Sequence, residues 1–280
     1  MELRETAKNM LTSCLAAKPG ETLLVITDDS RVKIGTAIYE AGKELGCEVM
    51  LLVMKEREVS GQEPPETVAA AMKAADIVVC PTAKSLTHTN ARINAVKAGA
   101  RIATMPGITE EMFSRGAMTA DYDEVEKLTA RVTALLTAAS EAVIEKDGCR
   151  LTLALAGRDG VPSPGVYREK GKSGNLPSGE AYIAPLEDGS NGEMIVDGSM
   201  VGVGKLSTPL RVTVREGRLR AITGEGSEKL GILLANERNS TLGELGIGTN
   251  KADCHMDGII LKPTLYLDGR KIIDHGEFLA

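Results

Sequence analysis

Residues 22–54 read TLLVITDDSRVKIGTAIYEAGKELGCEVMLLVM, and this stretch decides the fold of the first half of the chain. It contains an apolar run at 22–27, a helical pattern that Gly46 ends, and a second apolar run at 47–54. Two short apolar runs joined by one helix are typical of a β–α–β unit in a parallel sheet. The stretch therefore predicts an α/β domain.

The alternation of helices and strands continues around this unit. The patterns predict helices at 3–17, 66–75, 85–99 and 121–144, and further strands at 76–82 and 100–105. No repeat of 20 to 50 residues is present. We therefore expect residues 1–146 to form an α/β domain with an open sheet.

The pattern changes after residue 146, where glycine and β-forming residues dominate. LRVTVREGRLRAIT (210–223) and LKPTLYLDGRKIID (261–274) are predicted hairpins with EG and DG turns, and one helix is predicted within GSEKLGILLANER (226–238). We therefore expect residues 147–280 to form an α+β domain with a mostly antiparallel sheet.

Composition limits the classes of function. The net charge of −6 and an aromatic content of 2% oppose nucleic-acid binding, which needs cations and stacking rings. No apolar run is long enough to span a membrane, and the charged N-terminus is unlike a signal peptide. The five cysteines form no CxxC pair. We expect a cytoplasmic protein with buried free thiols and with no nucleic-acid or membrane partner.

The ends of the predicted parallel strands are the usual ligand-binding positions in α/β domains. Here they read TDDS and PTAKSLTHT, and neither carries a glycine-rich nucleotide signature. His88 lies between two threonines at a predicted helix start, which favours a capping segment or an interface. The alternative is a histidine that reaches a site formed by the other domain or by another subunit.

Four residues of the second half are candidate metal ligands. Glu180 ends the motif NLPSGE, Glu244 begins ELGIGTN, and His255 and Asp257 flank one residue of CHMDG. In an extended segment, His255 and Asp257 would share one face. Imidazole and carboxylate ligands suit Zn, Fe or Mn. The alternatives are a surface turn at Glu180 and a simple hydrogen bond between His255 and Asp257, whereas His275 is expected to be solvated.

Together the motifs resemble the aminopeptidase T type of metallo-aminopeptidase, the leucyl aminopeptidase family. The likeness covers nearly the whole chain and includes GQEPPETVAAAM, NLPSGEAYIAPLEDGSNG, ELGIGTN and HMDGIILKPTLYLDGR. The resemblance implies a homodimeric peptidase with a two-metal site of Zn, Co or Mn in the C-terminal domain. Glu180 and Glu244 match the catalytic carboxylates of that site, and His255 and Asp257 match its last metal ligands.

The sequence departs from that family between GIGTN and HMDG. Relatives carry a longer segment there, with a further metal-ligating histidine, whereas only KADC separates Asn250 from His255 here. The resemblance therefore implies a peptidase that is weakened or inactive. One alternative is a mononuclear iron dioxygenase resembling 2,5-dihydroxypyridine dioxygenases, whose two His and one Asp are matched in part by His255 and Asp257. The other alternative is a non-catalytic ligand-binding homologue.

Overall fold

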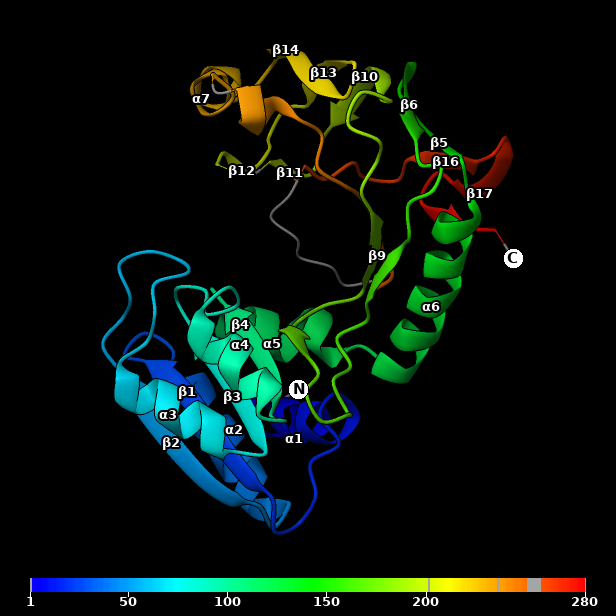
Figure 1. Ribbon diagram of the computed structural model, residues 1–280. Helices are drawn as coiled ribbons and strands as arrows, with labels where there is room; N and C mark the ends of the chain where they lie inside the picture. The colour runs from blue at the N-terminus through cyan, green and yellow to red at the C-terminus, as the bar shows by residue number, and fades with distance from the viewer. Residues whose placement is uncertain (1, 201, 236, 251–257, 280) are drawn as a thin grey trace. The chain divides into compact units, whose positions relative to one another are not determined.

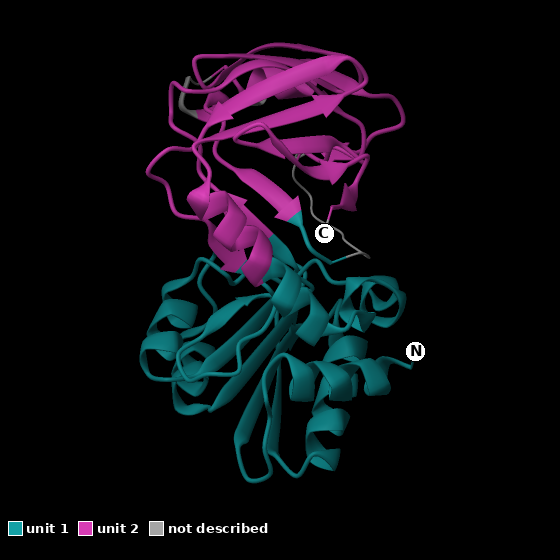
Figure 2. Ribbon diagram, turned by 90° about the vertical axis from the view of Figure 1, so that its right-hand side faces the viewer, with its two compact units in different colours: residues 1–129, 163–180, 248–254 teal, residues 130–162, 181–247, 255–280 magenta. Residues whose placement is uncertain are grey.

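The structure is a computed structural model that describes residues 2–200, 202–235, 237–250 and 258–279 (Figure 1). The chain forms two compact units, and each unit is assembled from three segments of the sequence (Figure 2). Unit 1 contains Met1–Thr129, Ser163–Glu180 and Gly248–Cys254, and unit 2 contains Ala130–Pro162, Ala181–Ile247 and His255–Ala280. The expected division into domains 1–146 and 147–280 stays a prediction.

Unit 1 contains a parallel sheet of five strands within the described residues. Its order is β2-β1-β3-β4-β8, and every neighbouring pair is parallel. The strands are β1 (Thr22–Asp28), β2 (Glu48–Met54), β3 (Ile77–Thr82), β4 (Arg101–Pro106) and β8 (Ser173–Asn175). The first four follow the predicted β–α–β pattern, whereas β8 comes from a distant segment and extends the sheet beyond β4.

Helices cover both faces of this sheet. They are α1 (Leu3–Ser13), α2 (Val32–Glu44), α3 (Glu66–Ala74), α4 (Asn90–Lys97) and α5 (Glu110–Arg115), with a short 3-10 helix η1 (Ala117–Thr119) and the start of α6 (Tyr122–Ala138). Leu23 and Val25 of β1 belong to the core shared with α1, α2 and α5. Leu24 and Ile26 belong to the core shared with α3 and α4. Successive residues of a strand face opposite sides, so β1 is apolar on both faces.

Unit 2 contains an antiparallel sheet of eight strands within the described residues. Its order is β14-β13-β10-β6-β5-β16-β17-β18. The strands are β5 (Glu141–Lys146), β6 (Cys149–Ala154), β10 (Asn191–Val196), β13 (Leu210–Arg215), β14 (Arg218–Thr223), β16 (Thr264–Leu267), β17 (Arg270–Asp274) and β18 (Glu277–Phe278). Burial alternates along β6 and β13, as expected for strands with one face toward the core.

Smaller elements complete the described chain. The strands β11 (Ser199–Met200) and β12 (Gly204–Lys205) pair with each other, and a three-stranded sheet has the order β15-β9-β7. Its strands are β7 (Val161–Ser163), β9 (Glu180–Ile183) and β15 (Leu245–Gly248). The helix α7 (Ser227–Leu233) and the 3-10 helix η2 (Glu237–Ser240) follow β14. The predicted fold class, a parallel α/β half and a largely antiparallel half, is confirmed.

Tight two-residue turns join four pairs of neighbouring strands in unit 2. Each turn has a non-glycine residue and then a glycine, both with positive φ, as in a type I′ turn. The four turns are Asp147–Gly148, Glu216–Gly217, Asp268–Gly269 and His275–Gly276. The predicted EG and DG turns at 216–217 and 268–269 are therefore confirmed.

Three predicted helix boundaries are wrong. The helix predicted over 121–144 ends at Ala138, because residues 141–146 pair with β6 through the Asp147–Gly148 turn. The first helix ends at Ser13 rather than at residue 17. The helix predicted from residue 85 begins at Asn90, because Thr89 is its N-cap and accepts a hydrogen bond from Arg92 N.

Two expectations from composition can be compared with the structure. Within the described residues, no helix is long and apolar enough to cross a membrane. Cys14, Cys47, Cys80 and Cys149 are buried free thiols, as predicted, and burial raises the pKa of Cys14 and Cys47 above the ordinary value. Cys254 lies outside the described residues.

Candidate functional site

The candidate carboxylates lie on or beside two neighbouring strands. Glu180 is the first residue of β9 and is half-buried, and Glu244 is exposed and directly precedes β15. β9 and β15 are adjacent in the three-stranded sheet. His255 and Asp257 lie outside the described residues, so their predicted role as ligands stays a prediction. Within the described part of the chain, no group of three or more His, Cys, Asp or Glu side chains could hold a metal ion.

The motif NLPSGE is joined to the motif GIGTN by backbone hydrogen bonds. Thr249 N and Asn250 N both donate to the carbonyl oxygen of Gly179, at 2.7 and 3.2 Å. We call the joined segments 178–179 and 249–250 the clasp. It lies wholly within unit 1. The clasp therefore places the residue before Glu180 directly against the last described residue before the segment that carries His255.

Asn250 fixes the clasp with its side-chain amide. Its Nδ2 donates to the carbonyl oxygens of Ser178, at 2.9 Å, and of Ala117, at 3.1 Å. Only 4% of Asn250 is exposed. An amide nitrogen has two N–H donors, and both are used on backbone carbonyls. Asn250 therefore ties the two motifs to each other and to η1.

Gly179 allows the close approach in the clasp. Its φ is +144°, and an added Cβ would lie 2.4 Å from Asn250 Cβ and 3.0 Å from Asn250 N. That separation is far shorter than real carbon–carbon contacts, so a larger residue would push the two segments apart. The glycine of NLPSGE is therefore required by the fit to GIGTN.

A pair of threonine hydroxyls anchors the clasp to α6. Thr129 Oγ1 lies 2.6 Å from Thr249 Oγ1 and 2.7 Å from the carbonyl oxygen of Val125. A hydroxyl has one proton, and that of Thr129 is donated to Val125, so Thr249 is the donor to Thr129. Both threonines are buried. Sequence reasoning missed Asn250, Thr129 and Thr249, and its only signal for them was a set of small polar residues inside otherwise apolar stretches.

The first expected ligand position, at the end of β1, is filled by the chain itself. The strand order of unit 1 reverses at β1, with β2 on one side and β3 on the other, and ligands of such sheets bind outside that point. Asp28 is 1% exposed there. Its Oδ2 accepts from Ala83 N at 2.6 Å, and its Oδ1 accepts from the backbone N and hydroxyl of Ser30. A protein carboxylate therefore occupies the amides that could bind an anion.

A hydroxyl cluster lies at the second expected position, where Thr87 of the PTAKSLTHT segment after β3 meets Thr104 of β4 and Asn175 of β8. Thr87 and Thr104 hydroxyls both donate to Asn175 Oδ1, at 2.8 Å each. Asn175 is the first residue of NLPSGE, and its carbonyl accepts from the hydroxyl of Tyr167, at 2.8 Å. Burial raises the pKa of Tyr167 above its ordinary value, so this phenol stays a donor. The cluster therefore fixes the other end of the NLPSGE stretch.

The two described histidines are on surfaces. His88 is exposed, next to the N-cap Thr89, which agrees with the capping interpretation. The side chain of His275 is 86% exposed, and its Nδ1 lies 3.1 Å from Asp274 Oδ1. The predicted solvation of His275 is therefore confirmed, and neither histidine belongs to a group of potential ligands in the described residues.

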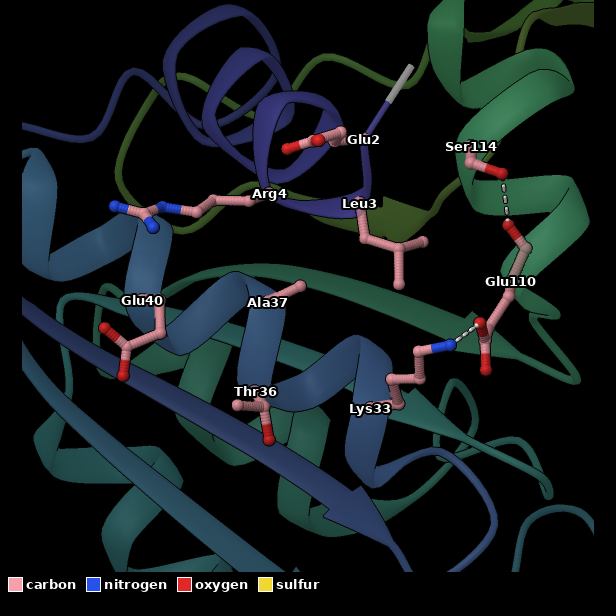
Figure 3. Close-up of a pocket in the computed structure, with 9 residues that line it drawn as sticks. All are labelled: Glu2, Leu3, Arg4, Lys33, Thr36, Ala37, Glu40, Glu110 and Ser114. Atoms are coloured by element: carbon pink, nitrogen blue, oxygen red, sulfur yellow. Dashed lines mark hydrogen bonds and ion pairs between the residues drawn. The ribbon is translucent and has the colours of Figure 1, made fainter.

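One pocket of the described structure lies among helices of unit 1. It has a volume of about 510 Å³ and lies in unit 1, between α1, α2 and α5 (Figure 3). Lys33 on α2 forms an ion pair with Glu110 on α5 across its wall, as Figure 3 shows. Neither of the two described candidate ligands, Glu180 and Glu244, lines the pocket. Its mixed charges and open form indicate a surface groove between helices rather than an active site.

Comparison with known proteins finds one matching family and two solved structures with a similar fold. Residues 2–232 match the NicX family, described as 2,5-dihydroxypyridine 5,6-dioxygenase. A solved 2,5-dihydroxypyridine dioxygenase from Pseudomonas putida KT2440 is similar, with a TM-score of 0.73 and 16% identity over 99% of this chain and 97% of that chain. Wild-type AmpT from Thermus thermophilus is also similar, with a TM-score of 0.71 and 15% identity over 99% of both chains.

No curated protein sequence matches the chain. The predicted likeness to aminopeptidase T is confirmed at the level of the fold, because identities of 15% and 16% carry no more than that. The family match favours the dioxygenase alternative over the peptidase that we expected first. It contains Glu180 and ends before Glu244, His255 and Asp257. Because the match covers most of the described sequence, the chain belongs to the NicX family.

Proposed function

We propose that the chain is a metal-dependent dioxygenase that opens the ring of a hydroxylated pyridine or a similar nitrogen heteroaromatic. The observation that carries the proposal is the family match over residues 2–232. The whole-chain likeness to a solved 2,5-dihydroxypyridine dioxygenase supports the same fold. The low aromatic content and the absence of a nucleotide signature agree with a small substrate rather than a nucleic acid.

The donor types of the chain fit a divalent transition-metal ion. Three carboxylates, Glu180, Glu244 and Asp257, and one imidazole, His255, are available, and such oxygen and nitrogen ligands suit Fe, Mn or Zn. A set of two His and one Asp would need a second imidazole. The described candidates for it are exposed surface residues, so we expect a carboxylate to take that place. More carboxylate ligands would shift the metal preference toward harder ions such as Mn.

The chain's own residues would bind the ion and orient the substrate. Bound Fe(II) would supply the electron chemistry that O₂ needs in order to react with an aromatic ring. His255, Asp257 and Glu244 would hold the ion in this scheme. The half-buried Glu180 would accept a proton from a ring hydroxyl, since a carboxylate within hydrogen-bond reach of a substrate hydroxyl can act as a general base.

A metallo-aminopeptidase is the second candidate function. The set of three carboxylates and one imidazole favours it, because two-metal hydrolytic sites are rich in carboxylates that bridge and flank the ions. The fold likeness to AmpT over 99% of both chains agrees with it. In this case Glu180 or Glu244 would orient the attacking water, and Zn, Co or Mn would be bound. We expect the protein to be a homodimer under either candidate function. Light scattering on the purified protein measures its mass, and a monomer mass would contradict the homodimer.

One comparison separates the candidates. Metal-free protein is loaded with Fe(II) or Mn(II) without oxygen, and O₂ uptake is followed with 2,5-dihydroxypyridine. Portions loaded with Zn, Co or Mn are assayed with aminoacyl p-nitroanilides. The proposal predicts O₂ uptake and loss of the ring absorbance with Fe(II) or Mn(II). Amine release without O₂ uptake would favour the peptidase, and metal binding with neither reaction would indicate a non-catalytic homologue.

Variants of the candidate ligands test the site itself. His255→Ala and Asp257→Ala should each lower the bound metal per chain by at least half, since each removes a ligand. His275→Ala and His88→Ala are matched controls, because both histidines are exposed. Metal content is measured by atomic emission after dialysis. Retention of metal in both ligand variants, or loss in a control, would contradict the assignment.

A further inference from the structure

The strand β2 forms an edge of the parallel sheet of unit 1, and within the described residues β1 is its only strand partner (Figure 1). Its seven residues, EVMLLVM, pair with β1 over their whole length without a register shift. Met50 is 47% exposed and Val53 is 50% exposed. They lie on opposite faces of the sheet, because successive strand residues alternate. The edge is therefore long, regular and apolar on both faces.

The other edges of the two large sheets are protected. The strands β8 and β18 have three and two residues. The strand β14 carries Arg218 and Arg220, and its pairing with β13 has a register shift. Short length, charge and irregularity are the usual means by which an edge strand avoids pairing with another chain. β2 contains neither lysine nor proline, and its one charge, Glu48, stands at its first position, so it has the form of a strand that pairs.

Three residues of β2 direct their backbone groups away from β1. Glu48 N donates to the carbonyl oxygen of Glu21 at 2.9 Å, so the backbone of Glu48 faces β1. In a parallel pair, every second residue of a strand directs its N–H and C=O at the same neighbour. The even-numbered residues of β2 therefore face β1, and Val49, Leu51 and Val53 direct their N–H and C=O groups outward.

This block of three outward residues has a defined start and end. Before it, Cys47 N donates to the carbonyl oxygen of Gly42 at 3.0 Å. After it, the carbonyl oxygen of Lys55 accepts from the guanidinium of Arg57 at 3.0 and 3.2 Å. The outward groups on either side of the block are therefore engaged within the chain. Since the block is symmetric about Leu51, two antiparallel copies match it completely in one register.

We propose that β2 pairs with β2 of a second copy of this chain, antiparallel and about a two-fold axis through Leu51. Leu51 would exchange two hydrogen bonds with its own counterpart, and Val49 would exchange two with the partner's Val53. The parallel sheet of one copy would then continue into that of the other, as a closed two-fold dimer. The pairing gives the expected homodimer an interface and does not depend on the reaction that the chain catalyses.

The charges around β2 favour this orientation and register. Glu48 begins the strand and Lys55 follows it, so antiparallel copies bring opposite charges to the same end. Moving the axis to Leu52 would place Glu48 opposite the partner's Glu56, and like charges directly opposite each other are destabilising. A second copy therefore supplies the shape, the polarity and the charges that this edge requires.

Cysteine cross-linking tests the pairing and its register. Met50 would lie opposite the partner's Leu52 in a non-hydrogen-bonded pair, with Cα atoms about 4.5 Å apart, which a disulfide can bridge. Chains with Met50→Cys are mixed with chains with Leu52→Cys, equilibrated, oxidised mildly and separated on a non-reducing gel. The mixture should form a disulfide-linked dimer. Each variant alone should form no more than the parent, which controls for the native cysteines.

Substitutions at the exposed positions test the interface through the dimer Kd, measured by sedimentation. The N–H of Val53 faces outward, so Val53→Pro leaves the pairing with β1 intact. It should raise the Kd by at least about 30-fold, because each copy loses one donor. Val53→Thr keeps the N–H and the branched shape and is the matched control, with a Kd near that of the parent. Met50→Lys serves if Val53→Pro does not fold, since it places an ammonium against the partner's Leu52.

The outcomes decide the proposal. A cross-link specific to the mixture, together with a weakened dimer in folded Val53→Pro or Met50→Lys, is the expected result. A parent that is monomeric at every concentration tested would overturn the pairing. A dimeric parent would also overturn it if the mixture gave no more disulfide than the parent, because another surface would then hold the dimer. An unchanged Kd in a folded Val53→Pro or Met50→Lys variant would overturn it as well.

Discussion

The loops of the two units are fixed in different ways. In unit 2, the turns at 147–148, 216–217, 268–269 and 275–276 are set by two consecutive residues with positive φ. In unit 1, the loops after β1 and before β9 are held by partners far away in the sequence, such as Ala83 for Asp28 and Asn250 for Ser178. The turns of unit 2 are therefore set by the residues of the turn itself. In unit 1, hydrogen bonds between distant segments hold the loop that precedes the candidate ligand Glu180.

The largest expected loss of stability is at Gly179, and it is compared with the loss at Gly269, a glycine in a local turn of unit 2. Gly179→Ala should lower the free energy of unfolding by at least about 3 kcal/mol, because its Cβ would overlap Asn250 and its φ is +144°. Gly269→Ala is the control. Gly269 has φ +79°, and a Cβ added there would have no atom within 4 Å. This change should lower the free energy of unfolding by only about 1 kcal/mol. Urea denaturation measures both, and equal losses would break the contrast.

The next effect concerns the carboxylate at the end of β1. Asp28→Asn should cost about 2 kcal/mol, because both carboxylate oxygens accept hydrogen bonds and an amide would turn one acceptor into a donor. Asp29→Asn changes the same group on an exposed neighbour and should be nearly neutral. Similar denaturation midpoints for the two variants would show that the loop is not held through Asp28.

The free energy of unfolding should fall at alkaline pH because Cys80 is buried in the parallel sheet of unit 1. Burial in β3 raises the pKa of Cys80 from 9.0 to about 12. Between these values the unfolded thiol loses its proton while the folded one keeps it, so the free energy of unfolding falls as pH rises. The slope from one proton is about 1.4 kcal/mol per pH unit. Cys80→Val should remove that part of the slope, and parallel curves for parent and variant between pH 9 and 11 would contradict it.

The smallest effect is a stabilisation in a unit 2 turn. Glu216 has φ +49°, which asparagine tolerates better than glutamate in a type I′ turn. Glu216→Asn should raise the free energy of unfolding by about 0.5 kcal/mol. Asp147→Asn, at φ +47°, should have a similar or smaller effect, measured by the same denaturation. A loss of stability at both positions would show that these turns are not set by local φ preference.

The same contrast explains how far the sequence predicts the structure. The hairpin at 210–223 is predictable because its pattern and its EG turn lie within fourteen consecutive residues. The four strands β1 to β4 follow from periodicity in the same way. The bond from Asn250 to Ser178 spans 72 positions, and no local pattern marks it. Similarly, the pairing of β8 with β4 joins segments whose link is visible only in three dimensions.

The candidate site shows the same limit. Glu180 and Glu244 stood out as isolated acids in glycine-rich motifs, and neighbouring strands do carry them. Their supporting residues were missed, because Thr129 looks like an ordinary polar position of an amphipathic helix. The sequence motifs also could not decide between peptidase and dioxygenase, since carboxylate and imidazole ligands suit both hydrolytic metal sites and non-haem iron oxygenases.

The three-segment construction of unit 1 has a consequence for biosynthesis. Its first segment ends at Thr129, but the clasp needs Asn250, which leaves the ribosome 121 residues later. At typical elongation rates this delay is on the order of 10 s. During that time the nascent sheet can pair β1 to β4, while the NLPSGE stretch has no GIGTN partner. Newly made chains should therefore complete unit 1 as a late event, after much of their parallel sheet has formed.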